Sequence, residues 1–272
     1  MSERGIQAAE QISIRLQPYC TVLLKLFIDP DGRKRAVQVG SGTLIRVGMT
    51  HGILTAFHCT VPLKGDYLLG LSAAPEGSAH NFTLEPRMLN IIPIAEPIDD
   101  ERGPDLAFIT IADWHKVETV KASKAFYDLL PDRDVILNDP PPLDRSLWYL
   151  CGVPYERIES VPAEAGFETM FQFQHLCGAG GIDRTFERDG FDYAEMDVLP
   201  APDDPPPSSF EGMSGGGLWQ VPVAPAQGVA FSAVNHYLSG VIYYQGVTST
   251  GTRYVRSHFR RSIYDHVLSA LS

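Results

Sequence analysis

Three residues of this 272-residue chain could together carry out nucleophilic chemistry: Ser214, His58 and Asp105. Ser214 lies in "GMSGGGLW" (212–219), where four glycines surround one hydroxyl. Glycine permits close backbone approach and unusual dihedral angles, so this stretch predicts a serine presented on a tight turn. A serine hydroxyl is a weak nucleophile at neutral pH. It reacts when a base takes its proton and a third group orients that base.

His58 is the candidate base and Asp105 the candidate orienting acid. "GILTAFHCT" places His58 at the end of an apolar strand, immediately before an expected turn. "RGPDLAFITI" places Asp105 at the head of an apolar run, where a partly desolvated carboxylate needs a partner. Each stretch also has a simpler explanation: a flexible glycine-rich loop, a buried structural histidine and a turn-initiating aspartate. Taken one at a time, the three stretches leave both interpretations open.

Four motifs, taken in order along the chain, resemble those of trypsin-like, chymotrypsin-fold serine peptidases, including the cytosolic members found in bacteria. The motifs are "GSGTLI" (40–45), "TAFHC" (55–59), "DLAFI" (105–109) and "GMSGG" (212–216). The resemblance covers most of the chain, from about Tyr19 to the C-terminal helix. "GMSGG" also fits the nucleophile elbow of α/β-hydrolases, but that fold needs an acid and a histidine after the serine. Too few residues follow Ser214 for this, and the preceding pattern is strand-rich.

The resemblance implies a role for each candidate residue. His58 is the general base, Asp105 its orienting carboxylate, and Ser214 the nucleophile that hydrolyses peptide bonds through an acyl-enzyme. The backbone N–H groups of Gly212 and Ser214 form the oxyanion hole, which explains why so little side chain surrounds the serine. The resemblance implies no cofactor and no metal ion, and a protein or peptide as substrate.

Two residues depart from the pattern of the secreted members. Met213 stands where those members carry an aspartate that pairs with a newly cleaved N-terminal amine. A methionine forms no such ion pair, so we expect the loop to be held by packing, or to be ordered by a substrate or an activating partner. Cys59 follows His58 as in the family, but its expected disulfide partner falls near Gly40, so we expect a free thiol.

By the same resemblance, substrate specificity depends on two segments. The floor of the pocket falls at Ser208 or Ser209, where no acid is present to favour Arg or Lys. We therefore expect a preference for an uncharged or small polar side chain. "LSGVIYYQG" (238–246) resembles the strand that pairs with the substrate backbone, and it brings Tyr243, Tyr244 and Gln245 to the substrate.

The elements that must position these residues are mostly short β-like runs separated by turn signals, a pattern that favours a barrel or sandwich. With the resemblance, it predicts an all-β fold of two six-stranded antiparallel β-barrels with the active site between them, plus N-terminal and C-terminal helices. The expected segments are an N-terminal helical extension (1–18), a first barrel with His58 and Asp105 (19–118), a helix and proline-rich linker (119–144), a second barrel with Ser214 (145–256) and a C-terminal helix (257–272).

The C-terminal segment carries a basic patch and two histidines. We expect the patch to be a solvated helix face and both histidines to lie on the helix. These residues are Arg253, Arg256, Arg260, Arg261, His258 and His266.

Composition excludes several function classes. The formal net charge of −11 and a pI near 5.1 disfavour binding to nucleic acid or to an anionic membrane. No apolar run has membrane-spanning length, and the N-terminus lacks the pattern of a signal peptide. The four cysteines are scattered without metal-ligand spacing, which favours free thiols in the reducing cytoplasm.

The sequence thus predicts a cytoplasmic serine endopeptidase, activated by a partner rather than by N-terminal cleavage. The alternative is a catalytically silent module of the same fold that binds peptides or partners.

Overall fold

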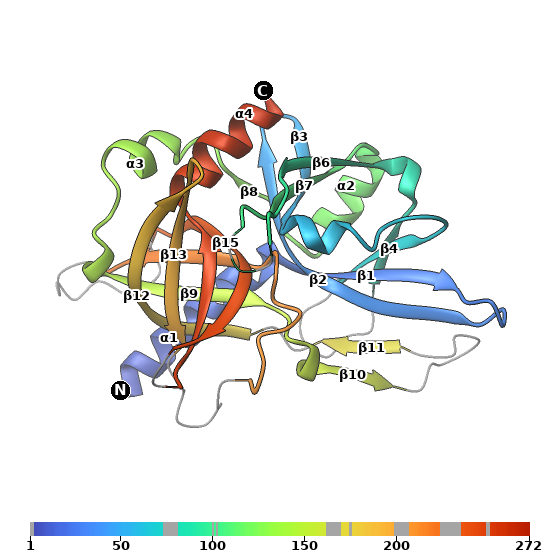
Figure 1. Cartoon of the computed structure of the whole chain (residues 1–272), viewed down its shortest axis with the longest axis horizontal. Helices are drawn as coiled ribbons and strands as arrows, with labels where there is room; N and C mark the ends of the chain where they lie inside the picture. The colour runs from blue at the N-terminus through green and yellow to red at the C-terminus, as the bar shows by residue number, and fades with distance from the viewer. Residues whose placement is uncertain are drawn as a thin grey trace.

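The computed structural model describes residues 3–72, 81–99, 101, 103–161, 170–173, 176–198, 207–223, 235–248 and 251–272. Within them, two antiparallel β units lie next to each other (Figure 1). This arrangement confirms the predicted all-β, chymotrypsin-like two-barrel fold.

The first unit is one strongly curved sheet with the strand order β5-β4-β1-β2-β3-β7-β6. Its strands are β1 (Cys20–Ile28), β2 (Lys34–Val47), β3 (Thr50–Thr55), β4 (Leu68–Ser72), β5 (Asn81–Leu84), β6 (Leu89–Ala95) and β7 (Leu106–Ile111). The end strands β5 and β6 follow each other in the chain through a short 3₁₀ turn, Pro86–Met88. Because Pro86 has no N–H to donate, it interrupts the ladder there. Counted as one bent strand, β5 and β6 complete a sheet of six strands that curls back on itself.

The second unit is a closed barrel of six antiparallel strands in the order β12-β13-β16-β15-β14-β9. These are β9 (Ser146–Gly152), β12 (Leu176–Arg188), β13 (Phe191–Val198), β14 (Gly217–Pro222), β15 (Tyr237–Val247) and β16 (Arg253–His258). A separate two-stranded sheet pairs β10 (Ile158–Val161) with β11 (Met170–Phe173).

Helices lie at both ends of the chain and between the two units. They are α1 (Glu3–Leu16), α2 (Trp114–Lys121), α3 (Arg133–Asn138) and, after a π-helical turn at Ser262–Val267, α4 (Leu268–Leu271). The predicted linker region 119–144 therefore contains the end of α2, the short strand β8 (Tyr127–Asp128) and α3. Shorter 3₁₀ turns lie at Gln17–Tyr19, Phe57–Thr60, Leu143–Arg145 and Tyr155–Arg157. None of the helices described here is long and apolar enough to cross a membrane.

The predicted start of the C-terminal helix at residue 257 is wrong, because β16 continues to His258. Ser257 and His258 pair with β13 on one side and β15 on the other, which closes the second barrel. The expected solvated arginine face is wrong for two of its four members: Arg253 and Arg261 are exposed, but Arg256 and Arg260 are buried. Arg256 lies on β16, is only 3% exposed, and forms a 2.7 Å ion pair with Glu195 of β13.

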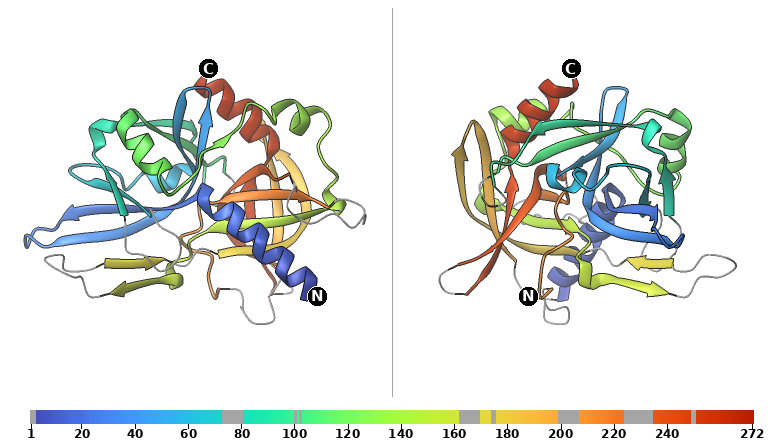
Figure 2. Two further views of the ribbon diagram at one scale, coloured as in Figure 1. Left: turned by 180° about the vertical axis from the view of Figure 1, so that it is seen from behind. Right: turned by 45° about the vertical axis from the view of Figure 1, so that its right-hand side comes forward.

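One apolar cluster joins the two β units and both terminal helices. It includes Phe108 of the first unit, Trp219 of the second, Leu16 of α1 and Ile263 of the C-terminal segment, all fully or almost fully buried. Helix α1 lies against the second barrel on the side opposite to that seen in Figure 1 (Figure 2). The cluster therefore fixes how the two units pack against each other.

The docking of α1 can be tested on two aliphatic residues of one helix. Leu16 is fully buried, whereas Ile14 is 53% exposed. We expect Leu16→Ala to lower the free energy of unfolding by about 2–5 kcal/mol, because it leaves a cavity in the shared cluster. Ile14→Ala should change it by about 0.5 kcal/mol or less. Urea denaturation measures both values, and equal losses would show that α1 does not dock through this face.

Candidate active site

The three candidate residues lie where the two β units meet. His58 is on the 3₁₀ turn that follows β3, and Asp105 directly precedes β7. These strands pair antiparallel with Thr55 opposite Ala107, so the end of β3 and the start of β7 lie at the same edge of the sheet. Ser214 is on the loop before β14 of the second barrel.

Asp105 holds His58 at two points. Its Oδ1 accepts the backbone N–H of His58 at 2.9 Å, and its Oδ2 is 2.5 Å from Nδ1 of the ring. The Asp105 side chain is 2% exposed, whereas the His58 side chain is 41% exposed. An ionised carboxylate only accepts hydrogen bonds, so Nδ1 carries the proton. The neutral ring then has a free acceptor at Nε2.

The pKa of His58 is raised above its ordinary value of 6.5. Burial acts to lower it, but the hydrogen bond with Asp105 and the neighbouring Cys59 thiol together outweigh burial. The hydrogen bond and the thiol both favour the imidazolium form of His58. Asp105 therefore makes His58 a stronger base than a free imidazole.

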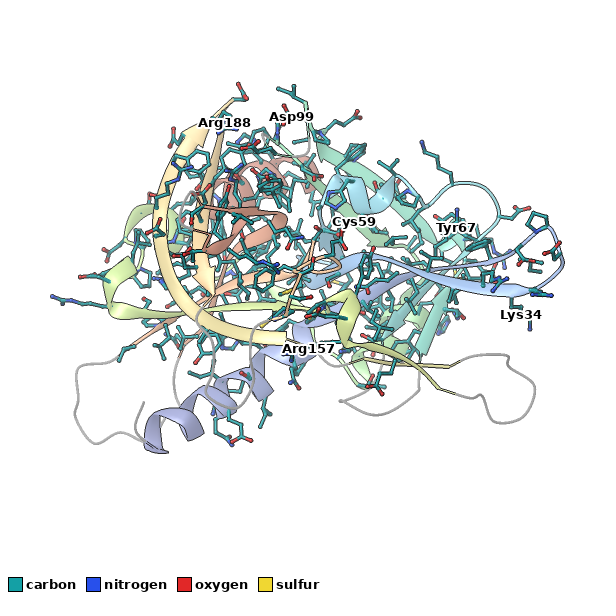
Figure 3. The ribbon with its side chains drawn as sticks, turned by 60° about the horizontal axis from the view of Figure 1, so that its bottom comes forward. Lys34, Cys59, Tyr67, Asp99, Arg157 and Arg188 are labelled. Carbon is teal, nitrogen blue, oxygen red and sulfur yellow. The ribbon has the colours of Figure 1, made fainter. Side chains whose placement is uncertain are left out.

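The Ser214 loop is tied to both β units. The Ser214 carbonyl accepts the backbone N–H of Ser41 on β2 at 2.7 Å and the Cys59 thiol at 3.5 Å. Figure 3 shows Cys59 near the junction of the two units. On the other side, Gly215 donates its N–H to the Ile242 carbonyl of β15 at 2.7 Å.

The Ser214 hydroxyl donates to the Tyr243 carbonyl at 3.5 Å. Within the residues described, Ser214 and His58 form no hydrogen bond with each other. The structure thus brings His58 together with Asp105, and places Ser214 against Cys59, the residue after His58.

Two backbone N–H groups of the Ser214 loop have no acceptor among the described residues. The Glu211 carbonyl accepts from Tyr155 at 2.8 Å, and the Met213 carbonyl accepts from Gly216 at 2.8 Å. In a trans peptide the N–H points away from the preceding C=O, so the N–H groups of Gly212 and Ser214 face the opposite way. They are two unused donors, one on the serine itself and one two residues before it.

Glycine is required at positions 212 and 215. Both have a φ of +90°, which residues with a Cβ rarely adopt. A Cβ at position 215 would lie 2.0 Å from the Ser41 carbonyl oxygen, and one at 212 would lie 2.7 Å from that of Val153. Both collisions are with backbone atoms, so the loop could not keep this path with larger residues.

Met213 is fully buried in the core of the second barrel, together with Phe210 and Leu150. Gly152 gives it room, since a Cβ there would lie 3.1 Å from the Met213 Cβ. Cys59 is buried and not in a disulfide. The Ser214 loop is therefore anchored by the apolar packing of Met213, a residue that cannot form an ion pair.

The three predicted specificity residues on β15 lie in different surroundings. Gln245 crosses from β15 to the loop, where its Oε1 accepts from the Phe210 N–H at 2.7 Å and its Nε2 donates to Ser209 Oγ at 3.0 Å. The Tyr243 side chain is 3% exposed and belongs to the core, so this residue faces Ser214 through its backbone carbonyl. Tyr244 is half-buried, and its ring lies against the Arg256 guanidinium, 5.1 Å from the ring centroid.

The sequence did not predict a carboxylate beside Ser208. Glu156 accepts from the Ser208 N–H at 2.6 Å and from its hydroxyl at 2.5 Å, and both residues are exposed. Glu156 is distant in the sequence, and no local pattern connects it with the serine loop. Each oxygen of the Glu156 carboxylate therefore accepts one hydrogen bond from Ser208.

The sequence also misplaced His258. Its side chain is fully buried on β16, and its Nε2 accepts the backbone N–H of Asp105 at 2.9 Å. The segment "RYVRSH" (253–258) has no apolar/polar alternation, so no local pattern indicated this position. In the described part of the chain, no group of three or more His, Cys, Asp or Glu could hold a metal ion.

Among proteins of known structure, 182 chains are similar to this one, whereas no family model and no curated protein matches the sequence. One solved structure similar to this chain is the protease of tobacco vein mottling virus, with a TM-score of 0.44 and 10% sequence identity. The match covers 93% of this chain and 82% of that one.

The effect of Asp105 on His58 predicts a measurable titration. We expect the pKa of His58, followed by NMR of its ring protons, to lie above 6.5 and to fall towards 6.5 in Asp105→Asn. Because the folded pKa exceeds the unfolded one, the pair stabilises the fold fully below about pH 6.5. That contribution is lost as the pH rises through the folded pKa. A wild-type midpoint at or below 6.5 would contradict the assignment, and His58→Ala identifies the resonance.

Proposed function

We propose that this chain is a serine endopeptidase that uses His58, Asp105 and Ser214. The observation that supports it best is the combination of a histidine held at two points by a buried aspartate and a serine loop with two unused N–H donors. General base, nucleophile and oxyanion donors are the parts that acyl transfer needs.

In the proposed mechanism, His58 Nε2 takes the Ser214 proton while Oγ attacks the carbonyl carbon of the substrate. The resulting oxyanion accepts from the N–H groups of Gly212 and Ser214, and loss of one such donor typically costs about 10²–10³ in rate. The imidazolium then gives its proton to the leaving amine, and the C–N bond breaks to leave an ester on Ser214. Water hydrolyses the ester by the same proton path, while Asp105 stays ionised and holds the ring.

The substrate backbone is proposed to add to the edge of β15. In the described residues, β14 pairs with β15 only as far as Gly217 opposite Val241, whereas β16 continues along the other side of β15. The edge beyond Ile242 therefore offers backbone groups to an extended peptide. Gln245 lies on this stretch and bridges to the Ser214 loop, so it narrows the space for the side chain next to the scissile bond.

Three peptide phosphonates carrying an Ala, Phe or Lys side chain test this preference, because each inactivates a serine peptidase through its specificity pocket. We expect the wild type to react fastest with the Ala compound. In Gln245→Ala the ratio of Phe to Ala rates should rise by roughly tenfold or more, since a pocket wall is removed. Comparing rates within one variant cancels differences in active fraction. A wild type that prefers Lys would instead assign the pocket to Glu156.

A second candidate function is a silent module that binds peptides. It is favoured by one observation, the hydroxyl of Ser214 bonded to the Tyr243 carbonyl and not to His58. A peptidase activated by a partner is the intermediate case, in which that partner reorients the serine. The Cys59 thiol, which is outside any disulfide, suits the reducing cytoplasm that we propose for either function.

Labelling with a fluorophosphonate, read by intact mass, separates these functions. The probe reacts with an activated serine and needs no knowledge of the substrate. We expect one adduct on the wild type and none on Ser214→Ala or His58→Ala, since either change removes the activated nucleophile. No adduct on folded wild type would reject a self-sufficient peptidase. Adduct formation only after addition of native host lysate would then support activation by a partner.

A further inference from the structure

The His258 ring contacts the main chain of Asp105, whereas His58 contacts the Asp105 carboxylate. The Nε2 atom of His258 accepts the Asp105 N–H at 2.9 Å, and no part of the His258 residue is exposed. His258 belongs to β16 of the second barrel, whereas Asp105 directly precedes β7 of the first unit. This hydrogen bond therefore crosses from one unit to the other at the proposed orienting acid.

The surroundings of His258 keep its ring neutral. The rings of Tyr193, Tyr243 and Phe191 lie 5.1, 5.0 and 5.6 Å from it, centroid to centroid. Because Nε2 accepts a hydrogen bond, the ring proton is on Nδ1, which has no partner among the described residues.

Burial lowers the pKa of His258 to about 3. The charged groups that act on it are Asp105, which raises the pKa, and His266 of the C-terminal segment, which lowers it.

A neutral acceptor at this position has a chemical consequence. A lysine or arginine here would place a positive charge beside Asp105 and weaken its attraction for the His58 imidazolium. An apolar residue would leave the buried Asp105 N–H without the acceptor that it has in this structure, and losing that bond costs free energy. Histidine satisfies the N–H and leaves the negative charge of Asp105 to His58. His58 and His258 both contact Asp105, but their surroundings shift their pKa values in opposite directions. Opposite shifts of this kind indicate different roles for the two histidines.

We propose that His258 is a positioning residue, which fixes the main chain of Asp105 and thereby holds the His58–Asp105 hydrogen bond in place. Its effect on reaction rate rests on the proposed function. Its effect on the His58–Asp105 hydrogen bond does not, because that bond exists in the free protein.

The test uses two substitutions of nearly equal length, His258→Gln and His258→Met. Only glutamine offers an amide oxygen near the position of Nε2, so the pair differs mainly in the acceptor. His115→Gln, on an exposed residue of α2, controls for the loss of a histidine elsewhere. Two readouts are measured on folded protein: the low-field NMR resonance of the His58 Nδ1 proton, and the rate and pH midpoint of fluorophosphonate labelling.

We expect His258→Gln to keep the resonance and a labelling rate within a few-fold of the wild type. His258→Met should lose the resonance, label roughly tenfold to hundredfold more slowly, and shift its pH midpoint towards 6.5, because a misplaced Asp105 no longer holds the base. A folded Met variant with the wild-type resonance and midpoint would overturn the proposal, as would a Gln variant that loses the resonance.

If His258→Met does not fold, the resonance of His258→Gln decides alone: its presence supports the proposal and its loss overturns it. If the wild type never labels, the proposed function fails, while the NMR comparison still decides the role of His258.

Discussion

A carboxylate with almost no exposed surface persists in a folded protein only when hydrogen bonds replace the water it has lost. Asp105, 1% exposed, is such a group, and its position determines much of the structure around it. Its oxygens bind the backbone and ring of His58, and its own N–H binds His258. These contacts require the end of β3, the start of β7 and the end of β16 to meet at one point. The first unit alone satisfies the carboxylate, whereas the backbone N–H of Asp105 needs the second barrel as well.

Apolar packing and directional hydrogen bonds both join the two β units. The cluster that contains Phe108 and Trp219 supplies a large contact, but hydrophobic burial is not directional and does not set register. Register at the site depends on Ser41 of β2. Its N–H binds the Ser214 carbonyl, its hydroxyl donates to the Gly212 carbonyl, and its carbonyl accepts from Thr55. Every polar group of this one serine is used, and two of them hold the nucleophile loop.

Local sequence patterns were sufficient for the parts of the site that are local. The glycines around Ser214, the strand end before His58 and the apolar run after Asp105 each reflect a constraint within about ten residues. The motif order then predicted the fold. His258 and Glu156 could not be found in this way, because their partners are set by barrel closure and loop packing. The same closure draws Ser257 and His258 into a strand, although the apolar spacing from Phe259 onward is helical.

Met213 shows how this loop differs physically from one held by an ion pair. An ion pair with a new N-terminus forms only after cleavage and depends on pH, whereas a fully buried methionine side chain needs neither. The Ser214 loop accordingly takes this path without such an ion pair, and its two N–H donors have no acceptor among the described residues. What still separates this geometry from the proposed reaction is the Ser214 hydroxyl, bonded to Tyr243 at 3.5 Å, the outer limit of a hydrogen bond. Such a bond is weak, so breaking it to turn the hydroxyl towards His58 costs little free energy. Under the proposal of an activating partner, the group that the partner reorients is the Ser214 hydroxyl, since Ser41 and the buried Met213 already hold the backbone of the loop.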